Sequence, residues 1–251
     1  CMLWVGTSWK MNGTRASSRT YVEALKQADH SAWGGVQAFI IPPATVLAEV
    51  SELLGPDSDV LLGAQNAHWT DAGAWTGEVS VPQVADAGAQ LVEVGHSERR
   101  ANFGDTDEVV NKKVRAIIGH GLRPVLCVGE SQEVFDAGDS VKFITDQADS
   151  ALEGVDPSSV VLAYEPIWAI GEHGREPQRD DLLRAFDALQ SRYGDAVTAV
   201  IYGGSANPGN ARELLGIPGV EGLFIGRAAW TGPGYVQMLG IAGEVARAHQ
   251  G

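Results

Sequence analysis

The chain has few thiols and no apolar run long enough to cross a membrane. Its 251 residues contain two cysteines, and we interpret Cys1, which precedes Met2, as an addition to the natural chain. The one native thiol, Cys127, excludes a disulfide framework within the chain and favours a reducing compartment, so we predict a cytoplasmic protein. No apolar run approaches about 18 residues, and the N-terminus lacks the features of a secretory signal. We therefore expect no membrane association.

Positive charge is also scarce, because 18 Lys and Arg residues stand against 32 Asp and Glu residues and give a formal net charge of -14. Nucleic-acid binding requires basic surface, so this balance argues against a nucleic-acid partner. An anionic small substrate would need a locally positive cleft, built from a lysine and helix N-termini. No paired metal-ligand spacing occurs among His68, His96, His120 and His173. Cys127 has no CxxC partner, so we predict no metal site.

Short apolar segments alternate with amphipathic stretches along the whole chain. The predicted strands are Leu3-Thr7, Gln37-Ile41, Val60-Ala64, Leu91-Val94, Arg123-Val128, Val160-Tyr164, Val197-Tyr202 and Gly222-Ile225. The predicted helices include Arg15-Ala28, Asp107-Gly119, Phe135-Leu152, Arg179-Arg192 and Tyr235-His249. Eight such units favour an all-parallel sheet that closes into one (β/α)8 barrel domain over residues 1–251. A doubly wound open sheet is the rival, but no G-x-G-x-x-G turn follows the first strand.

The segment Ala163-Tyr164-Glu165-Pro166-Ile167-Trp168-Ala169-Ile170-Gly171 is the most informative part of the sequence. An apolar strand ends in Glu165, and Pro166 stops the strand because it cannot donate a backbone hydrogen bond. Gly171 frees the backbone where a hinge can lie. The pattern predicts a loop that closes over Glu165 and expels water. The alternative is a structural glutamate that caps a helix or pairs with a lysine.

Polar residues follow the strands at the end where barrel enzymes place their chemistry. Lys10 follows the first strand, His96 the fourth and Glu165 the sixth. A base, an imidazole and an ammonium at one mouth suit proton abstraction next to a carbonyl, with an enediolate stabilised by the lysine. Each has a simpler interpretation: Lys10 as a solvated charge, His96 as a structural histidine. Glu98 and Arg99 could form an ion pair that holds their loop.

Glycine turns follow the seventh and eighth strands, at Gly203-Gly204-Ser205 and at Gly226. Backbone N–H groups at such turns commonly bind phosphate in barrels. Tight turns alone are the alternative reading. The placement on these two strands favours a phosphate site.

The motifs together resemble the triosephosphate isomerase family over essentially the whole chain. They are WKMNG (Trp9 to Gly13), TGEVS (Thr76 to Ser80), VGHSERR (Val94 to Arg100), CVGE (Cys127 to Glu130), AYEPIWAIG (Ala163 to Gly171) and YGGS (Tyr202 to Ser205). The resemblance implies a (β/α)8 TIM barrel, a homodimer and no cofactor. It implies that Lys10, His96 and Glu165 are catalytic and that Glu98 supports them.

The same resemblance assigns three further groups of residues. Substrate and phosphate binding would fall to Ser8, Gly171, Gly204, Ser205, Gly226 and Arg227. A closing lid would run from Pro166 to about Gly174 and include Ile167, Trp168, Ala169 and Ile170. The tip of the loop that enters the partner subunit would be Thr76, Gly77 and Glu78.

Three departures from the family pattern carry information about the substrate. Ser8 stands where the family has an asparagine, and this shorter side chain leaves room near the substrate. Arg227 stands where a second glycine is usual, and it either contacts the phosphate or fills its backbone cradle. The lid hinge reads Glu172-His173-Gly174, which puts a carboxylate near the mouth.

The Ser8 and Arg227 variants, in the segments TSWKM and IGR-A-W, resemble a branch of the family that interconverts L-erythrulose 1-phosphate and D-erythrulose 4-phosphate in tetritol catabolism. The resemblance therefore favours a cofactor-independent isomerase of small sugar phosphates with a tetrulose phosphate as substrate. The alternatives are ordinary triosephosphate isomerase of glycolysis with altered loops, and a barrel that binds sugar phosphate without turning it over.

Overall fold

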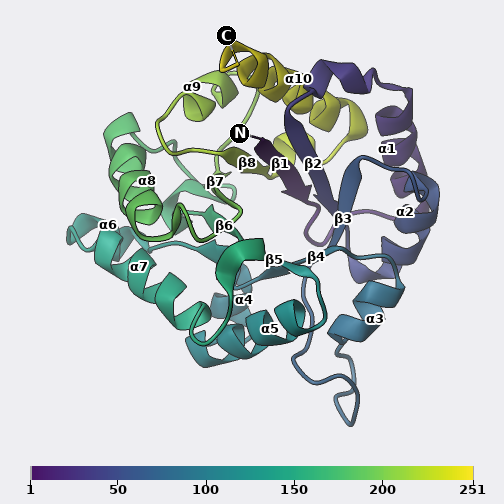
Figure 1. Ribbon diagram of the computed structural model, residues 1–251, viewed down its shortest axis with the longest axis horizontal. Coiled ribbons are helices and arrows are strands. Elements are labelled where there is room, and N and C mark those ends of the chain that lie inside the picture. The colour runs from purple at the N-terminus through teal and green to yellow at the C-terminus, as the bar shows by residue number, and fades with distance from the viewer. Residues whose placement is uncertain (1, 251) are drawn as a thin grey trace.

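A closed barrel of parallel strands forms the centre of the molecule in the computed structural model, which describes residues 2–250 (Figure 1). The strands pair in chain order, and β8 pairs with β1 to close the sheet. Their bounds are β1 Leu3–Ser8, β2 Val36–Ile41, β3 Val60–Ala64, β4 Leu91–Val94, β5 Arg123–Val128, β6 Val161–Tyr164, β7 Ala199–Gly204 and β8 Gly222–Ile225. The predicted (β/α)8 TIM barrel is confirmed.

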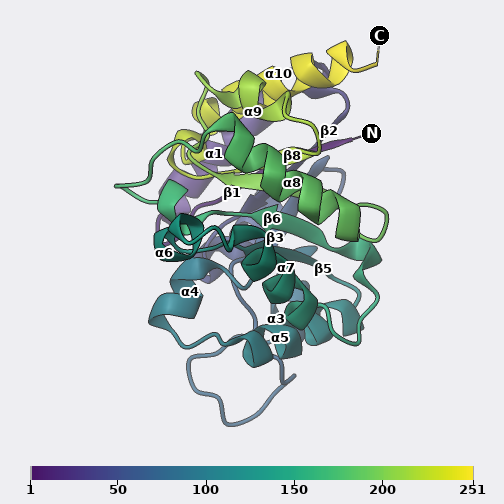
Figure 2. The same cartoon turned by 90° about the vertical axis from the view of Figure 1, so that its left-hand side faces the viewer.

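Helices surround the barrel on all sides, as the views along and across it show (Figures 1 and 2). The α-helices are α1 Arg15–Gln27, α2 Leu47–Leu54, α3 Val81–Asp86, α4 Ser97–Asn102, α5 Asp107–Gly119, α6 Gln132–Asp136, α7 Ser140–Ala151, α8 Arg179–Tyr193, α9 Ala211–Leu215 and α10 Gly232–Ala248. Short 3-10 helices lie at η1 His30–Trp33, η2 Ala44–Val46, η3 Pro157–Ser159, η4 Ile167–Ala169 and η5 Arg227–Ala229.

Both faces of the strands are buried, which explains why their sequences alternate so little. Alternate side chains point into the barrel and form an inner apolar cluster: Trp4, Phe39, Ile41, Leu91, Val125, Cys127, Val161, Ala163, Ala199, Ile201 and Phe224. The intervening side chains, such as Val92 and Val94, join the larger core between the sheet and the helices. The alternation therefore fixes which residue at the end of each strand faces the interior of the barrel.

Three predicted elements were wrong in extent. The last helix begins at Gly232 and not near Tyr235, because the Thr231 side chain caps it by accepting the Gly234 N–H. The segment 135–152 is two helices, because Gly138 adopts φ +79° and separates α6 from α7. The strand predicted from Val197 begins at Ala199, because the Val197 N–H bonds to the Tyr193 carbonyl and continues the turn that ends α8.

The fold bears on two predictions, that the chain does not cross a membrane and that Cys127 is a buried thiol. Within residues 2–250, no helix is both long and apolar enough to cross a membrane. Cys1 lies outside the described residues. Cys127 is buried on β5, and burial together with the nearby Glu165 carboxylate raises the pKa of its thiol far above the usual value. A buried neutral thiol of this kind acts as a small apolar side chain.

Candidate active site

A pocket of about 460 Å³ opens at the C-terminal ends of the strands, a volume suited to a small ligand. Its lining combines charged side chains with glycine turns: Ser8, Lys10, Glu93, His96, Glu165, Ala169, Ile170, Gly171, Glu172, Gly204, Ser205, Ala206, Asn207, Phe224, Ile225, Gly226, Arg227, Ala228 and Trp230. Every residue predicted from sequence to bind substrate or phosphate lies in this lining. Residues from five of the eight strands or the loops that follow them thus face one cavity.

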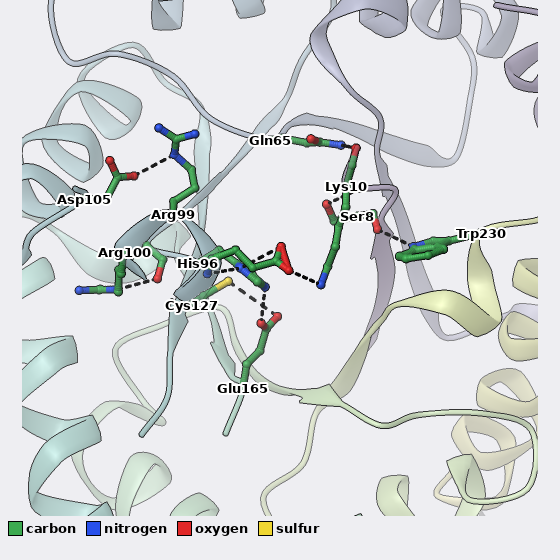
Figure 3. Close-up of polar contacts among 12 residues, drawn as sticks. Ser8, Lys10, Gln65, His96, Arg99, Arg100, Asp105, Cys127, Glu165 and Trp230 are labelled. Carbon is green, nitrogen blue, oxygen red and sulfur yellow. Dashed lines mark hydrogen bonds and ion pairs between the residues drawn. The ribbon is translucent and has the colours of Figure 1, made fainter. Parts of the chain in front are cut away.

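Lys10 is held in an unusual backbone conformation directly after β1. It is the one non-glycine residue with a left-handed φ in the described part of the chain, at +55°. Its carbonyl accepts a hydrogen bond from Nε2 of Gln65 at 2.8 Å, and its N–H lies 3.4 Å from the Ser8 hydroxyl. Such strain persists only where surrounding contacts fix it. The contacts therefore direct the ammonium group of Lys10 toward the pocket (Figure 3).

Glu165 follows β6 and is enclosed by two glycines. A side chain at Gly129 would collide with the Glu165 carbonyl, and one at Gly203 would collide with its carboxylate arm. The Glu165 N–H bonds to the Val128 carbonyl at 2.8 Å and extends the sheet by one residue. The two glycines therefore leave room for Glu165, whose carboxylate is buried at the base of the pocket.

His96 caps the N-terminus of α4, and this role fixes its ring. Its Nδ1 accepts the Glu98 N–H at 3.1 Å, so the neutral imidazole carries its proton on Nε2. Nε2 lies 2.8 Å from Oε2 of Glu165. Oε2 has no well-aligned hydrogen-bond partner within residues 2–250, so this approach is close but oblique. The Glu165 carboxylate is therefore near the imidazole without being locked by it (Figure 3).

The buried charges around His96 act on its pKa in opposite directions. Burial lowers the pKa, but the carboxylates of Glu165, Glu93 and Glu98 outweigh burial and raise it to about 9. The largest of these favourable effects comes from Glu165. A ligand that separates the two side chains removes that effect and favours the neutral imidazole.

Glu98 pairs with a different cation from the one the sequence suggested. The alternative of an ion pair between Glu98 and Arg99 is wrong, because Arg99 pairs with Asp105 at 3.0 Å. Glu98 instead accepts a hydrogen bond from Nζ of Lys10 at 2.8 Å. It therefore links the first and fourth strand ends at the mouth, although it does not line the pocket itself.

The predicted lid, from Pro166 to about Gly174, contains η4, and Trp168 anchors it. That indole is buried beside Phe135, with the two ring centroids 4.6 Å apart, and the Arg175 guanidinium lies 4.5 Å from its centroid. Ser205 donates a hydrogen bond to the Ala169 carbonyl at 3.0 Å. Gly171 adopts φ +80°, as the expected hinge requires. The segment in this structure therefore contacts the loop after β7.

The loops after β7 and β8 form the other side of the pocket. Arg227 is exposed at the mouth, and its neighbour Gly226 faces open space where a Cβ would stand. Of the two alternatives left by the sequence, the arrangement favours an arginine that reaches a ligand over one that fills the cradle. Trp230 donates a hydrogen bond from Nε1 to the Ser8 carbonyl at 2.9 Å. Glu172 lines the same mouth, as expected from the hinge sequence.

Sequence reasoning missed several residues of the site, among them Asn207, Phe224 and Trp230 in the pocket lining. Gln65 positions the Lys10 carbonyl, and Glu93 lies in the pocket floor. A signal for Glu93 was present, because an acid interrupts the otherwise apolar strand Leu91–Val94.

The chain matches one protein family over nearly its whole length. The model of the triosephosphate isomerase family matches residues 3–242. The chain is 55% identical to L-erythrulose-1-phosphate isomerase of Mycolicibacterium smegmatis over 98% of its length and 94% of that protein. It is 45% identical to the Brucella abortus protein of the same name, over 94% of each chain. The Rhizobium rhizogenes protein of that name is 44% identical over 94% of this chain and 93% of its own.

Proposed function

The chain belongs to the triosephosphate isomerase family, and from that premise we propose that it interconverts L-erythrulose 1-phosphate and D-erythrulose 4-phosphate. The observation that carries the proposal is the convergence of Lys10, His96 and Glu165 in one pocket of this chain. Several relatives bear the name L-erythrulose-1-phosphate isomerase. That name supports the tetrulose substrate over the glycolytic triose and an enzyme over a silent binding barrel.

Glu165 is the proposed base. It removes the proton from C3 of L-erythrulose 1-phosphate, next to the C2 carbonyl, and an enediolate forms across C2 and C3. The same carboxyl group returns a proton to C2, and C3 becomes the carbonyl. Atoms and electrons balance without an oxidant or a cofactor. Because the new carbonyl lies nearer the other end of the chain, the product is numbered from that end. The carbon that carries the phosphate becomes C4, and the product is D-erythrulose 4-phosphate.

His96 and Lys10 are the proposed partners of the two oxygens. The Nε2–H of His96 faces the pocket, so it can polarise the carbonyl and pass protons between O2 and O3. The ammonium group of Lys10 offsets the negative charge of the enediolate. Glu98 holds that ammonium group by its 2.8 Å contact.

The phosphate is proposed to bind on the opposite side, among Gly171, Ser205, Gly226 and Arg227, which line the pocket together. Closure of the lid over this group would exclude water from the enediolate. The link between Ser205 and the Ala169 carbonyl supports coupling between phosphate binding and lid position.

We also propose a homodimer. The loop between β3 and α3, with Thr76, Gly77 and Glu78 at its tip, projects from the body in both views (Figures 1 and 2). Trp75 beside the tip is 47% exposed, and Met11 next to the catalytic lysine is 96% exposed. Apolar side chains in such positions mark contact surfaces. A mass near the chain value of 26.5 kDa by light scattering would contradict the dimer.

Two features support the remaining parts of the proposal. Cys127, the only cysteine within residues 2–250, is free and not in a disulfide, which supports a cytoplasmic location because disulfides are rare there. The name L-erythrulose-1-phosphate isomerase borne by relatives and the net charge of -14 support a metabolite, and not a nucleic acid, as partner.

The proposal is tested by incubating the protein with L-erythrulose 1-phosphate in deuterated water and following the product by NMR. We expect D-erythrulose 4-phosphate with solvent deuterium at the carbon that accepts the returned proton. The Glu165→Gln variant is the control and should form product at least 100-fold more slowly. Absence of turnover by the unmodified protein would overturn the proposed function.

A further inference from the structure

The floor of the pocket holds a buried acid that the proposed reaction does not use. Glu93 lies on β4, where Leu91 belongs to the inner apolar cluster and Glu93 occupies the next inward-facing position toward the mouth. Its side chain lines the same pocket as Lys10 and Glu165, and the residue is only 5% exposed. The inner cluster beneath it contains only apolar side chains.

The Glu93 carboxyl group is incompletely satisfied. Its Oε2 is buried without a hydrogen-bond partner among residues 2–250. A buried polar atom without a partner destabilises the folded state, so its retention calls for an explanation. Because the residue faces the pocket, a polar group of a bound ligand can provide the missing partner.

The surroundings of Glu93 agree with this position. Burial raises the pKa of Glu93 to about 7, and the Glu165 carboxylate adds to the rise. The charge of His96, a hydrogen bond from Ser8 and the charge of Lys10 act in the opposite direction. The group therefore lies among the proposed catalytic side chains, next to the serine that replaces the family's asparagine.

The group that distinguishes a four-carbon from a three-carbon substrate would lie on the β4 side of the pocket, where Glu93 is. L-erythrulose 1-phosphate differs from dihydroxyacetone phosphate, the ketose of the triose pair, by one hydroxymethyl group on the carbon that loses its proton. The proposed phosphate side of the pocket belongs to β6, β7 and β8. In a closed barrel with strands in chain order, β4 stands across from β8. The additional group therefore extends away from the phosphate, toward β4.

We infer that Glu93 determines substrate specificity: together with the Ser8 hydroxyl, it forms a subsite that hydrogen-bonds the terminal hydroxymethyl group of a four-carbon sugar phosphate. The inference rests on the proposed function and adds a residue and a contact to it. Glu93 here touches the non-reacting end of the substrate and takes no part in the proton transfer.

The first test compares kcat/KM for L-erythrulose 1-phosphate and D-glyceraldehyde 3-phosphate in Glu93→Val, Glu93→Gln and Leu91→Val. Removal of the carboxyl group in Glu93→Val should lower the tetrulose-to-triose ratio by roughly 10- to 100-fold. Glu93→Gln retains hydrogen-bonding atoms and should keep much of the ratio. Leu91→Val changes packing on the same strand and the same inward face, and it should leave the ratio unchanged.

A second test does not depend on turnover. Calorimetry with erythritol 4-phosphate and glycerol 3-phosphate, two unreactive polyol phosphates, measures the contribution of the additional hydroxymethyl group. The unmodified protein should bind the four-carbon ligand more tightly, and Glu93→Val should abolish that difference. The affinity difference should also change with pH near 7 in the unmodified protein and become constant in Glu93→Gln, a response that a purely structural carboxyl group would not give.

The outcomes separate the inference from the function on which it rests. If the unmodified protein does not isomerise L-erythrulose 1-phosphate, the proposed function fails. If it does, and Glu93→Val retains both the kinetic ratio and the affinity difference, only the role of Glu93 is overturned. Equal losses for both substrates would likewise contradict a specificity role and assign Glu93 to the shared catalytic machinery.

Discussion

Two regions of the barrel interior have opposite chemistry: a lower layer of side chains inside the barrel and an upper layer at its mouth. The lower layer is apolar, with Trp4 on β1, Leu91 on β4 and Ala163 on β6. On β4 and β6 the next inward-facing positions carry Glu93 and Glu165. On each of these two strands, an inward-facing apolar side chain is followed two residues later by an acid that faces the pocket.

The difference shows where this protein places stability and where it places chemistry. The lower layer consists of apolar side chains that contact one another. The upper layer contains Lys10 in a left-handed conformation, the unpartnered Oε2 of Glu93 and an oblique contact between His96 and Glu165. Each of these features disfavours the folded state. The lower layer and the outer core therefore hold a site that would not be stable by itself.

The largest effect should come from the upper layer. Glu165→Gln removes the proposed base while keeping the shape of the side chain, so kcat should fall by about 10²–10⁴-fold. Binding of erythritol 4-phosphate should remain, because the phosphate contacts are untouched. Steady-state kinetics and calorimetry measure the two effects, and full activity in this variant would show that the base lies elsewhere.

The lower layer should respond in stability rather than chemistry. Leu91→Ala leaves a cavity beneath Glu93 and should lower the free energy of unfolding by about 2–5 kcal/mol. Denaturant unfolding measures the loss. The folded fraction should retain a kcat within about tenfold of the unmodified value, a smaller change than that caused by losing the base. A collapse of kcat without a loss of stability would contradict the division between the layers.

The pH dependence of stability should reveal Glu93, an ionisable group of the upper layer. The folded-state pKa of Glu93, about 7, exceeds its usual value of 4.5, so the folded protein retains a proton that the unfolded chain releases. The free energy of unfolding should therefore fall as pH rises from 4.5 to 7, by up to about 3 kcal/mol. Glu93→Gln should remove that slope. Identical pH profiles for the two proteins would show that Glu93 is ionised in the folded state throughout this range.

The smallest effect concerns specificity at the edge of the site. The Ser8→Asn, Arg227→Gly double variant restores the family pattern at both positions and should shift the kcat/KM ratio toward the triose by about tenfold, the scale of one hydrogen bond. Assays with both substrates measure the shift. Proportional losses for the two substrates would show that neither position selects between them.

The barrel and most strand ends could be predicted from sequence, because eight apolar segments with intervening helices have few other solutions. The break at Gly138 was not predicted, because the amphipathic pattern continues through it. Glu93 was missed for a different reason. In a barrel both faces of a strand are buried, so apolar periodicity does not reveal which residues face the pocket. The acid within the apolar strand Leu91–Val94 was a signal, but the structure was needed to show that Glu93 reaches the same cavity as Glu165.

The central claim is that this site isomerises a four-carbon sugar phosphate. The most direct test measures kcat/KM of the unmodified protein for L-erythrulose 1-phosphate and D-glyceraldehyde 3-phosphate side by side. The account predicts a preference for the tetrulose of at least tenfold, since the additional hydroxymethyl group gains a buried hydrogen bond. A preference for the triose would contradict it and return the protein to the chemistry of glycolysis.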